Sequence, residues 1–515
     1  MGNSDPLFEL IKSLNKHEKI YFKVYCKDQK GSTKNYLGLF DEIIKQDQYD
    51  EKKIKEKFKN ELFIRQLPVA KDYLFKMIMK SLRSFNEVEP SPEVVLKKMI
   101  NDLSILFAKG LYKSCNKIIL KAKKIAEENE EFLLLLKILE TERKVLIARK
   151  ENALLDIQIQ ENLNAQLGTL EKHRNTLEFQ TLFNSIAYIT SEDYSIRNKT
   201  KMEEIDRLIQ NPLLQNPDSA LTFLAKWNYY IIHEQYHALT GDLTQSYTNL
   251  AKLVELFELK GNENFMTKYR EQYLRNLLPL SLCLASACKE EEFNMVYDKM
   301  VALLERYPEL KVRSFPITYI SQSAMLLNMG KFSQASAFAD NFEKEMTQFK
   351  GDKQKAIIVA LYFHIAYLFF GNREYYKALD YLNRVIADTS DKNREDVHTM
   401  ARILYLIIYY ELGYDELLDQ VSRSLYRYLL SRKRIYKFEE AILDFIRNKI
   451  PRLNRRTELM KSFKVLHQKF VQLSGDDYEK RPMDSFEFIS WLESKIENRS
   501  FAEIYLEKVE KKRLR

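Results

Sequence analysis

Three glycines in the C-terminal half of the chain recur at nearly equal spacing, and each closes an apolar run. These glycines are Gly330, Gly371 and Gly413. An aromatic residue follows each glycine within a few positions, and a small or aliphatic residue follows that aromatic. A fixed period of about 40 residues is typical of stacked helical hairpins. The sequence therefore predicts a chain built from repeated pairs of helices.

Few residues in this chain can interrupt a helix. Of its 515 residues, 12 are glycine and 11 are proline, about 2% each against roughly 7% and 5% in average proteins. Because these two residue types punctuate strands and turns, their scarcity favours long helices joined by short loops. We therefore expect an all-α fold: an α-solenoid of helical hairpins with a small N-terminal helical domain and a helical C-terminal cap.

Two interruptions of the helical pattern predict the domain boundaries. The stretch from Asn86 to Pro92 carries two prolines and breaks the pattern after the first helices. Pro451 opens the last block. The predicted domains are an N-terminal helical domain at 1–88, a helical-repeat region at 93–450 and a C-terminal cap at 451–515. A terminal cap is expected because the end of a stack needs a polar outer face.

The sequence predicts neither secretion nor membrane insertion. Asp5 and Glu9 fall where a signal peptide needs a basic start and an apolar stretch. The longest apolar run, from Ala356 to Phe370, is interrupted by His364 and is too short to cross a bilayer. The four cysteines lack metal-site spacing and are expected to be buried thiols. We therefore expect a cytoplasmic protein that needs no cofactor and contacts no membrane.

The order of residues around these turns resembles the tetratricopeptide repeat. In that family an inner helix ends near a glycine, and an outer helix packs on it through a small residue. Leu326 and Tyr367 match the large inner-helix position, and Phe332 matches the aromatic after the turn. Ala335 and Ala378 match the small position. The resemblance implies stacked helical hairpins over residues about 93–450.

The resemblance departs from the family pattern in its spacing. Gly371 lies two residues farther from Ala378 than the pattern requires, and the repeats run near 40 residues rather than roughly 34. Cys115, Ser246 and Leu418 are looser matches to the small position, after turns at Gly110, Gly241 and Gly413.

The repeat register indicates which side chains would face a partner. In that register, the inner helices before Gly371 and Gly413 direct these residues toward the concave side: Tyr362, Ile365, Phe369, Ile407 and Tyr410. An apolar concave surface suits an extended or helical peptide. The same side chains could instead form core or be covered by the chain's own C-terminal helices. The main hypothesis is a non-catalytic scaffold or adaptor for a protein or peptide, with partner identity and oligomeric state left open.

The positive charge of the chain is concentrated in two blocks. Of the net charge of +9, residues 1–86 carry +6 and residues 423–456 carry +8, so the remainder is acidic. The second block predicts a patch for an anionic partner, formed by Arg423, Arg427, Arg432, Lys433, Arg434 and Lys437. Arginine pairs phosphates or carboxylates through its planar fork, and interleaved tyrosines can stack on bases. The alternative is a solvated outer face.

The N-terminal helices add to a nucleic-acid hypothesis. A short helix over 50–58 and a longer helix over 67–85 could form a helix-turn-helix, with Lys71 and Lys76 projecting from the second helix. The connection is long for that motif, so the simpler alternative is an N-terminal cap. Together the two basic blocks give the second hypothesis, a DNA- or RNA-binding regulator.

One motif has the spacing of a catalytic zinc site. His233 and His237 share one face of a helix and could both bind zinc, with Glu234 as general base. A catalytic site also needs a third protein ligand, and no second motif supplies one. The same segment fits a helix that ends at the Gly241 turn, which predicts partly exposed histidines. A zinc-dependent hydrolase is the third hypothesis.

Overall fold

The computed structural model describes residues 5–27, 33–85, 91–149, 155–191, 199–260, 263–347, 355–388, 394–431, 436–446, 456–476, 479 and 483–513. Every regular element in these ranges is a helix, which confirms the all-α prediction. None of the helices found there combines the length and apolar character that crossing a bilayer requires. The predicted boundaries near residue 88 and at Pro451 fall outside the described residues.

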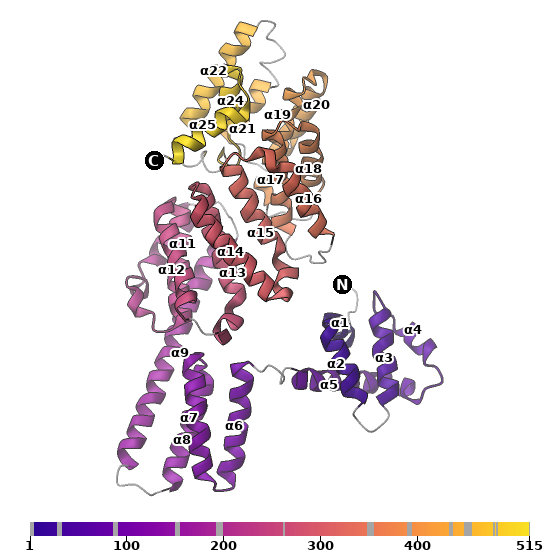
Figure 1. Ribbon diagram of the computed structural model, residues 1–515, viewed down its shortest axis with the longest axis vertical. Coiled ribbons are helices and arrows are strands. Elements are labelled where there is room, and N and C mark those ends of the chain that lie inside the picture. Colours follow the sequence, from indigo (N-terminus) through magenta and orange to yellow (C-terminus); the bar gives the residue numbers. More distant parts are fainter. Residues whose placement is uncertain are drawn as a thin grey trace. The chain divides into compact units, whose positions relative to one another are not determined.

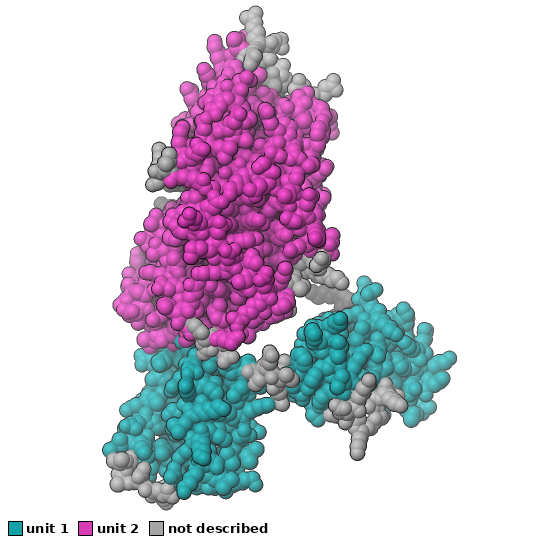
Figure 2. All heavy atoms as spheres, in the orientation of Figure 1, with its two compact units in different colours: residues 1–174 teal, residues 175–515 magenta. Residues whose placement is uncertain are grey.

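The chain divides into two compact units, Met1–Arg174 and Asn175–Arg515 (Figure 2). The first unit begins with a group of short helices: α1 (Pro6–Ser13), α2 (Lys16–Lys27), α3 (Thr33–Lys45), α4 (Glu51–Lys57), η1 (Leu62–Gln66) and α5 (Leu67–Phe85). These helices share a core that includes Ile11, Phe22, Phe40 and Leu74. A capping box starts α2, because Asn15 and Glu18 each accept a hydrogen bond from the other's backbone N–H.

A second group of helices in this unit has a core of its own. It consists of α6 (Pro92–Ala108), α7 (Tyr112–Glu128) and α8 (Phe132–Arg149). Their core includes Leu103, Cys115, Ile119 and Ile138. A long helix, α9 (Leu155–Ser191), begins in the first unit and ends in the second.

The second unit contains consecutive helix pairs followed by a C-terminal group (Figure 1). After the end of α9 come α10 (Lys199–Ile209), η2 (Pro212–Leu214) and η3 (Pro217–Ser219). The leading helices of the pairs are α11 (Phe223–Thr240), α13 (Glu263–Ser286), α15 (Pro308–Asn328), α17 (Lys355–Gly371) and α19 (Glu395–Glu411). The returning helices are α12 (Leu243–Lys260), α14 (Glu290–Arg306), α16 (Ala335–Met346, preceded by η4, Phe332–Gln334), α18 (Tyr375–Ala387) and α20 (Asp415–Ser431).

Each pair turns at a residue with left-handed backbone conformation. The turn residues are Gly241, Cys288, Gly330, Arg373 and Gly413, with φ of 82°, 57°, 64°, 63° and 71°. At Gly330 the backbone forms a Schellman motif, in which the N–H of Lys331 donates to the carbonyl of Leu326 at 2.9 Å. The equivalent hydrogen bond closes the turns at Cys288, Arg373 and Gly413. A common backbone motif therefore ends the leading helices.

The prediction that Gly371 forms the middle turn is wrong. Gly371 is the last residue of α17, and the left-handed turn residue is Arg373, two positions later. Gly371 serves a different need, because a Cβ atom built on it would overlap the Phe332 ring. A side chain at 371 would collide with this buried ring, so glycine is required here for close packing.

A buried residue follows each turn at a constant interval. Five positions after the turn residues come Ser246, Phe293, Ala335, Ala378 and Leu418, and all five are buried. This interval accounts for the extra distance between Gly371 and Ala378, because the interval begins at Arg373.

Buried hydroxyls join successive leading helices. Ser321 of α15 donates a hydrogen bond to Ser281 of α13, with an Oγ–Oγ distance of 2.8 Å. Ser323 of α15 contacts His364 of α17, with an Oγ–Nδ1 distance of 2.8 Å. The partners are 40 and 41 residues apart in sequence. These contacts between neighbouring pairs therefore join residues that are close to one repeat of about 40 residues apart.

Ion pairs join some of the returning helices in the same way. Lys299 of α14 pairs with Glu258 of α12 at 2.6 Å. Arg384 of α18 pairs with Glu343 of α16, and its guanidinium lies over the Tyr381 ring. Each pair again spans 41 residues of sequence.

The C-terminal group covers the ends of several leading helices. It consists of α21 (Lys437–Asp444), α22 (Arg456–Leu473), α24 (Phe488–Glu497) and α25 (Phe501–Arg513). The ring of Phe501 lies 5.7 Å from that of Phe332 and 5.3 Å from that of Phe370. Its neighbour Tyr505 also contacts Phe332, at 5.5 Å. These helices share one hydrophobic core with the helix pairs.

Candidate functional site

Most of the residues predicted to line a concave groove are buried within the chain. Ile365 and Ile407 are 0% exposed and Phe369 is 2% exposed. Their side chains belong to the core of the second unit, so the surface expected of them is not open in this structure. The helical periodicity correctly marks them as apolar-face residues, but it does not reveal which neighbours cover that face.

The two tyrosines of the predicted groove are half-buried and in contact with other elements. Tyr362 lies beneath the Arg384 guanidinium, 5.4 Å from its ring, and so faces the returning helices. Tyr410 contacts Phe463 of α22 and Trp491 of α24, with ring separations of 6.0 and 6.1 Å. The chain's own C-terminal helices thus occupy the place beside Tyr410 that a partner was expected to fill.

Polar contacts hold the C-terminal group against the helix pairs. Glu411, at the end of α19, accepts a hydrogen bond from the Trp491 indole at 2.7 Å and pairs with Lys495. The hydroxyl of Tyr367 accepts a hydrogen bond from the backbone N–H of Glu487 at 3.1 Å. Glu411 and Tyr367 therefore satisfy donors that would otherwise be stranded at a buried contact.

Only part of the predicted anionic-partner patch lies within the described residues. Arg432, Lys433 and Arg434 lie outside the described residues. Arg423 is exposed and pairs with Asp419 at 2.5 Å, and the guanidinium of Arg427 bonds the backbone of the preceding turn. Lys437 is exposed at the start of α21, 3.9 Å from Asp476. The acidic neighbours lower the local positive charge, and the nucleic-acid hypothesis stays a prediction.

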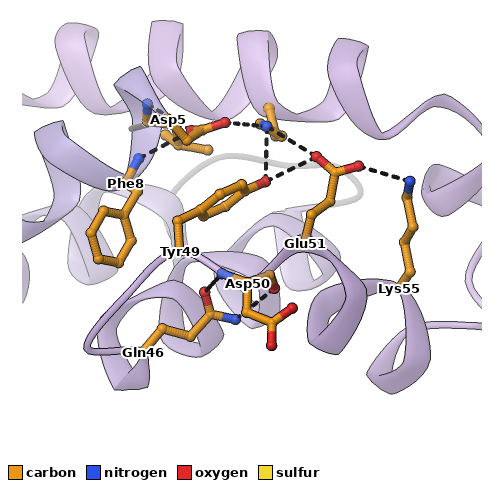
Figure 3. A network of polar contacts seen from close by, with 9 residues as sticks. Asp5, Phe8, Gln46, Tyr49, Asp50, Glu51 and Lys55 are labelled. Atoms are coloured by element: carbon orange, nitrogen blue, oxygen red, sulfur yellow. Dashed lines mark hydrogen bonds and ion pairs between the residues drawn. The ribbon is translucent and has the colours of Figure 1, made fainter. Parts of the chain in front are cut away.

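One of the two lysines expected to contact DNA, Lys71, lies within a polar network of the N-terminal helices. Figure 3 shows Asp5, Tyr49 and Glu51 converging on one point, with Lys55 beyond Glu51. At that point the Lys71 ammonium pairs with Asp5 and donates to the Tyr49 hydroxyl at 2.8 Å, with Glu51 at 3.6 Å. Only 18% of the Lys71 side chain is exposed. Lys71 therefore ties α5 to the start of α1 and does not project from its helix as predicted.

The other lysine predicted for DNA contact is exposed but paired. Lys76 forms an ion pair with Asp72 one helical turn away, at 2.6 Å. A surface pair of this kind contributes little to stability and is easily broken. Lys76 remains accessible to a partner.

The zinc-motif residues lie on one helix but point to different partners. The imidazole Nε2 of His233 donates to the backbone carbonyl of Leu214 at 3.0 Å. The ring of His237 stacks 6.3 Å from that of His233. Glu234 accepts a hydrogen bond from Ser246 at 3.3 Å, and burial raises the pKa of its carboxyl to about 7. A zinc ion bound through His233 Nε2 would have to replace the bond to Leu214.

No third ligand is assembled beside these histidines in the described part of the chain. Across those residues, no cluster of three or more His, Cys, Asp or Glu side chains has the arrangement of a metal site. The zinc-hydrolase hypothesis stays a prediction.

A cleft in the second unit was not predicted from the sequence. It is about 1010 Å³ in volume and lies between α14 and α16, with α15 as its floor. Phe315, Tyr319 and Gln322 line the floor, and Asn341 lines one wall. Asn341 holds the eleventh position after its turn residue, where the neighbouring pairs carry Lys299 and Arg384. The sequence signal for this difference is the alignment of the helix pairs by their left-handed turn residues.

Comparison with known proteins does not assign the chain to a group. No family model matches it, and no curated protein matches it either.

Proposed function

We propose that this chain is a non-catalytic helical-repeat scaffold that binds a protein or peptide segment. In this proposal the helix pairs from α11 to α20 are tetratricopeptide-like repeats stacked into a solenoid, and the C-terminal group is its cap. The proposal concerns the second unit, where each helix pair turns at a left-handed residue.

The observation that carries the proposal is the recurrence of contacts about 40 residues apart between neighbouring pairs. Ser281 with Ser321, Ser323 with His364, and the Glu258–Lys299 pair are 40 or 41 residues apart. In a repeat stack each unit contacts only its neighbours, so such intervals are expected throughout. Stacked repeats are extended, and this supports a role in holding a partner along a surface.

The proposal is tested by selecting peptides from a displayed library of random linear sequences with the intact chain. A scaffold of this type is expected to enrich related sequences, and their synthetic forms should bind the folded chain with a saturable 1:1 signal in fluorescence anisotropy. Heat-denatured chain serves as the control and should not bind them. Failure to enrich any peptide above a surface without protein would contradict the proposal.

A further inference from the structure

The cleft between α14 and α16 is a gap between two returning helices. Ion pairs join the returning helices on either side of it, α12 with α14 and α16 with α18. On one side, Lys299 of α14 reaches Glu258 of α12. On the other side, Arg384 of α18 reaches Glu343 of α16. No ion pair joins α14 to α16 within the described residues. The cleft opens at this step, which lies between two steps that are bridged by ion pairs.

The sequence explains why this step lacks a bridge. Glu305 stands at the same distance from its turn residue, Cys288, as Glu258 does from Gly241. The acceptor of an ion pair is thus present at the edge of the cleft. The position of α16 that corresponds to Lys299 in α14 holds Asn341. The short, neutral side chain of Asn341 cannot replace the ammonium of Lys299. With a neutral side chain at position 341, Glu305 has no cationic counterpart at this position of α16.

The cleft is long enough for an extended chain. Its floor runs along one face of α15 from Lys311 to Leu326, a rise of roughly 22 Å at about 1.5 Å per residue. An extended peptide advances about 3.3 Å per residue, so about six or seven residues fit along this floor.

The groups that line the cleft match the needs of a peptide backbone. The carboxamides of Gln322 and Asn341 each offer a donor and an acceptor, and neither side chain bonds another described residue. An extended backbone leaves its own N–H and C=O groups to be satisfied, whereas a helix has already paired them. Tyr319 is partly exposed on the floor beside the buried ring of Phe315, and it offers an aromatic contact to an apolar side chain.

The charges at one end of the cleft oppose a strongly charged ligand. Glu305 and Glu345 line this end together with Lys311 and Lys344. Because carboxylates and ammonium groups are balanced, the cleft offers no net attraction to a polyanion such as nucleic acid. Uncharged backbone amides are a better match.

We infer that the cleft between α14 and α16 binds an extended peptide segment through its main chain, with an apolar side chain on the Phe315–Tyr319 floor. This inference rests on the proposed scaffold function and names the surface that carries it. The absence of a cation at Asn341 is what keeps the surface open.

The test uses the peptides that the displayed library yields with the intact chain, and measures their affinity for three variants by fluorescence anisotropy. N341K supplies the missing cation, so its ammonium should pair with Glu305 and weaken binding at least tenfold. Q322A removes a floor carboxamide and should weaken binding about tenfold. S424K adds the same charge at the eleventh position after Gly413, away from the cleft, and should bind within twofold of the unmodified chain.

A modified peptide tests the mode of binding. Methylation of the backbone nitrogens one at a time should weaken binding at several positions, because it removes donors that the cleft satisfies. Circular dichroism and thermal melting confirm that each variant is folded before its affinity is compared.

The inference is overturned if N341K and Q322A both bind like the unmodified chain, or if S424K loses as much affinity as N341K. It is also overturned if no single methylation weakens the peptides. In those cases the scaffold proposal survives, because peptides still bind at another surface. If the library yields no binding peptide at all, the scaffold proposal itself fails.

Discussion

Gly371 and Gly413 look alike in the sequence, but the structure gives them different roles. Gly413 has a φ of +71° and empty space around the position of a Cβ. Gly371 is helical, and a Cβ there would overlap the ring of Phe332. Gly413 is needed for its backbone conformation, and Gly371 is needed for the close approach of Phe332 from a neighbouring helix pair.

The difference teaches that spacing between glycines is an incomplete measure of a repeat. At the turn after α17 the left-handed position is held by Arg373, and after α13 it is held by Cys288. The backbone motif recurs although its usual residue does not. The buried residue five positions after each turn residue recurs in every helix pair, whereas the glycine does not.

The largest effect is expected from Gly371→Ala. The added methyl must displace Phe332, which is 3% exposed and held by Tyr367, Phe501 and Tyr505. Overpacking of this kind should lower the free energy of unfolding by about 3 kcal/mol. Urea denaturation measures the loss.

A matched control for this change is Gly168→Ala. Gly168 lies within α9 and has nothing within 4 Å of its Cβ position. Alanine is the better helix former, so this variant should be unchanged or slightly more stable. Equal losses at positions 168 and 371 would contradict a packing role for Gly371.

The helices that precede the two glycines, α17 and α19, are also expected to respond differently to pH. Burial lowers the pKa of His364 in α17 to about 4, whereas α19 carries the buried Leu404 at the same distance from its turn. The unfolded chain has an ordinary histidine pKa of about 6.5. Stability from neutral His364 is therefore fully present above pH ~6.5 and is lost as pH falls toward 4.

His364→Leu should remove this part of the pH dependence. Between pH 7.5 and 4.5 the unmodified chain should lose about 2 kcal/mol more unfolding free energy than the variant does. Denaturant titrations at the two pH values measure this difference, and any constant cost of losing the Ser323 contact cancels. A variant with the unmodified pH profile would show that His364 does not titrate in the folded chain as stated.

A smaller loss is expected from Gly413→Ala. The left-handed conformation costs a residue with a Cβ about 1 kcal/mol, and no steric collision adds to it. Urea denaturation should show a loss of unfolding free energy about one third of the loss measured for Gly371→Ala. A loss as large as that of Gly371→Ala would remove the distinction between the two glycines.

The smallest change is expected from Arg373→Gly, and it has the opposite sign. Glycine removes the strain at a φ of +63°, while its freedom in the unfolded chain offsets part of the gain. The variant should be about 0.5 kcal/mol more stable. Destabilisation on thermal melting would indicate that the Arg373 side chain outweighs the strain.

The fold was predictable where it depends on local signals. The scarcity of glycine and proline and the apolar runs that end at glycines predicted the helices, because these signals act within a few residues. The turn at Arg373 was missed because a left-handed conformation is a property of the backbone, for which glycine is only the commonest residue. The position of Ala378 was the available signal.

The candidate site was less predictable because it depends on distant partners. Lys71 was expected to be exposed, but its partner Asp5 lies far away in sequence, at the start of α1. Ile365 and Ile407 were recognised as apolar, but their burial beneath other helices is a tertiary property. Asn341 at the cleft differs from Lys299 and Arg384, and this difference becomes visible only when the helix pairs are aligned by their turn residues.

A double-mutant cycle between Phe332 and Gly371 tests the stacking of the repeats most directly. The free energies of unfolding of Gly371→Ala, Phe332→Ala and the double variant are compared with that of the unmodified chain by urea denaturation. Because removal of the ring relieves the collision, the double variant should be about 2 kcal/mol more stable than the sum of the single effects predicts. Additive losses, within about 0.5 kcal/mol, would mean that Phe332 does not pack on Gly371 and would contradict this register.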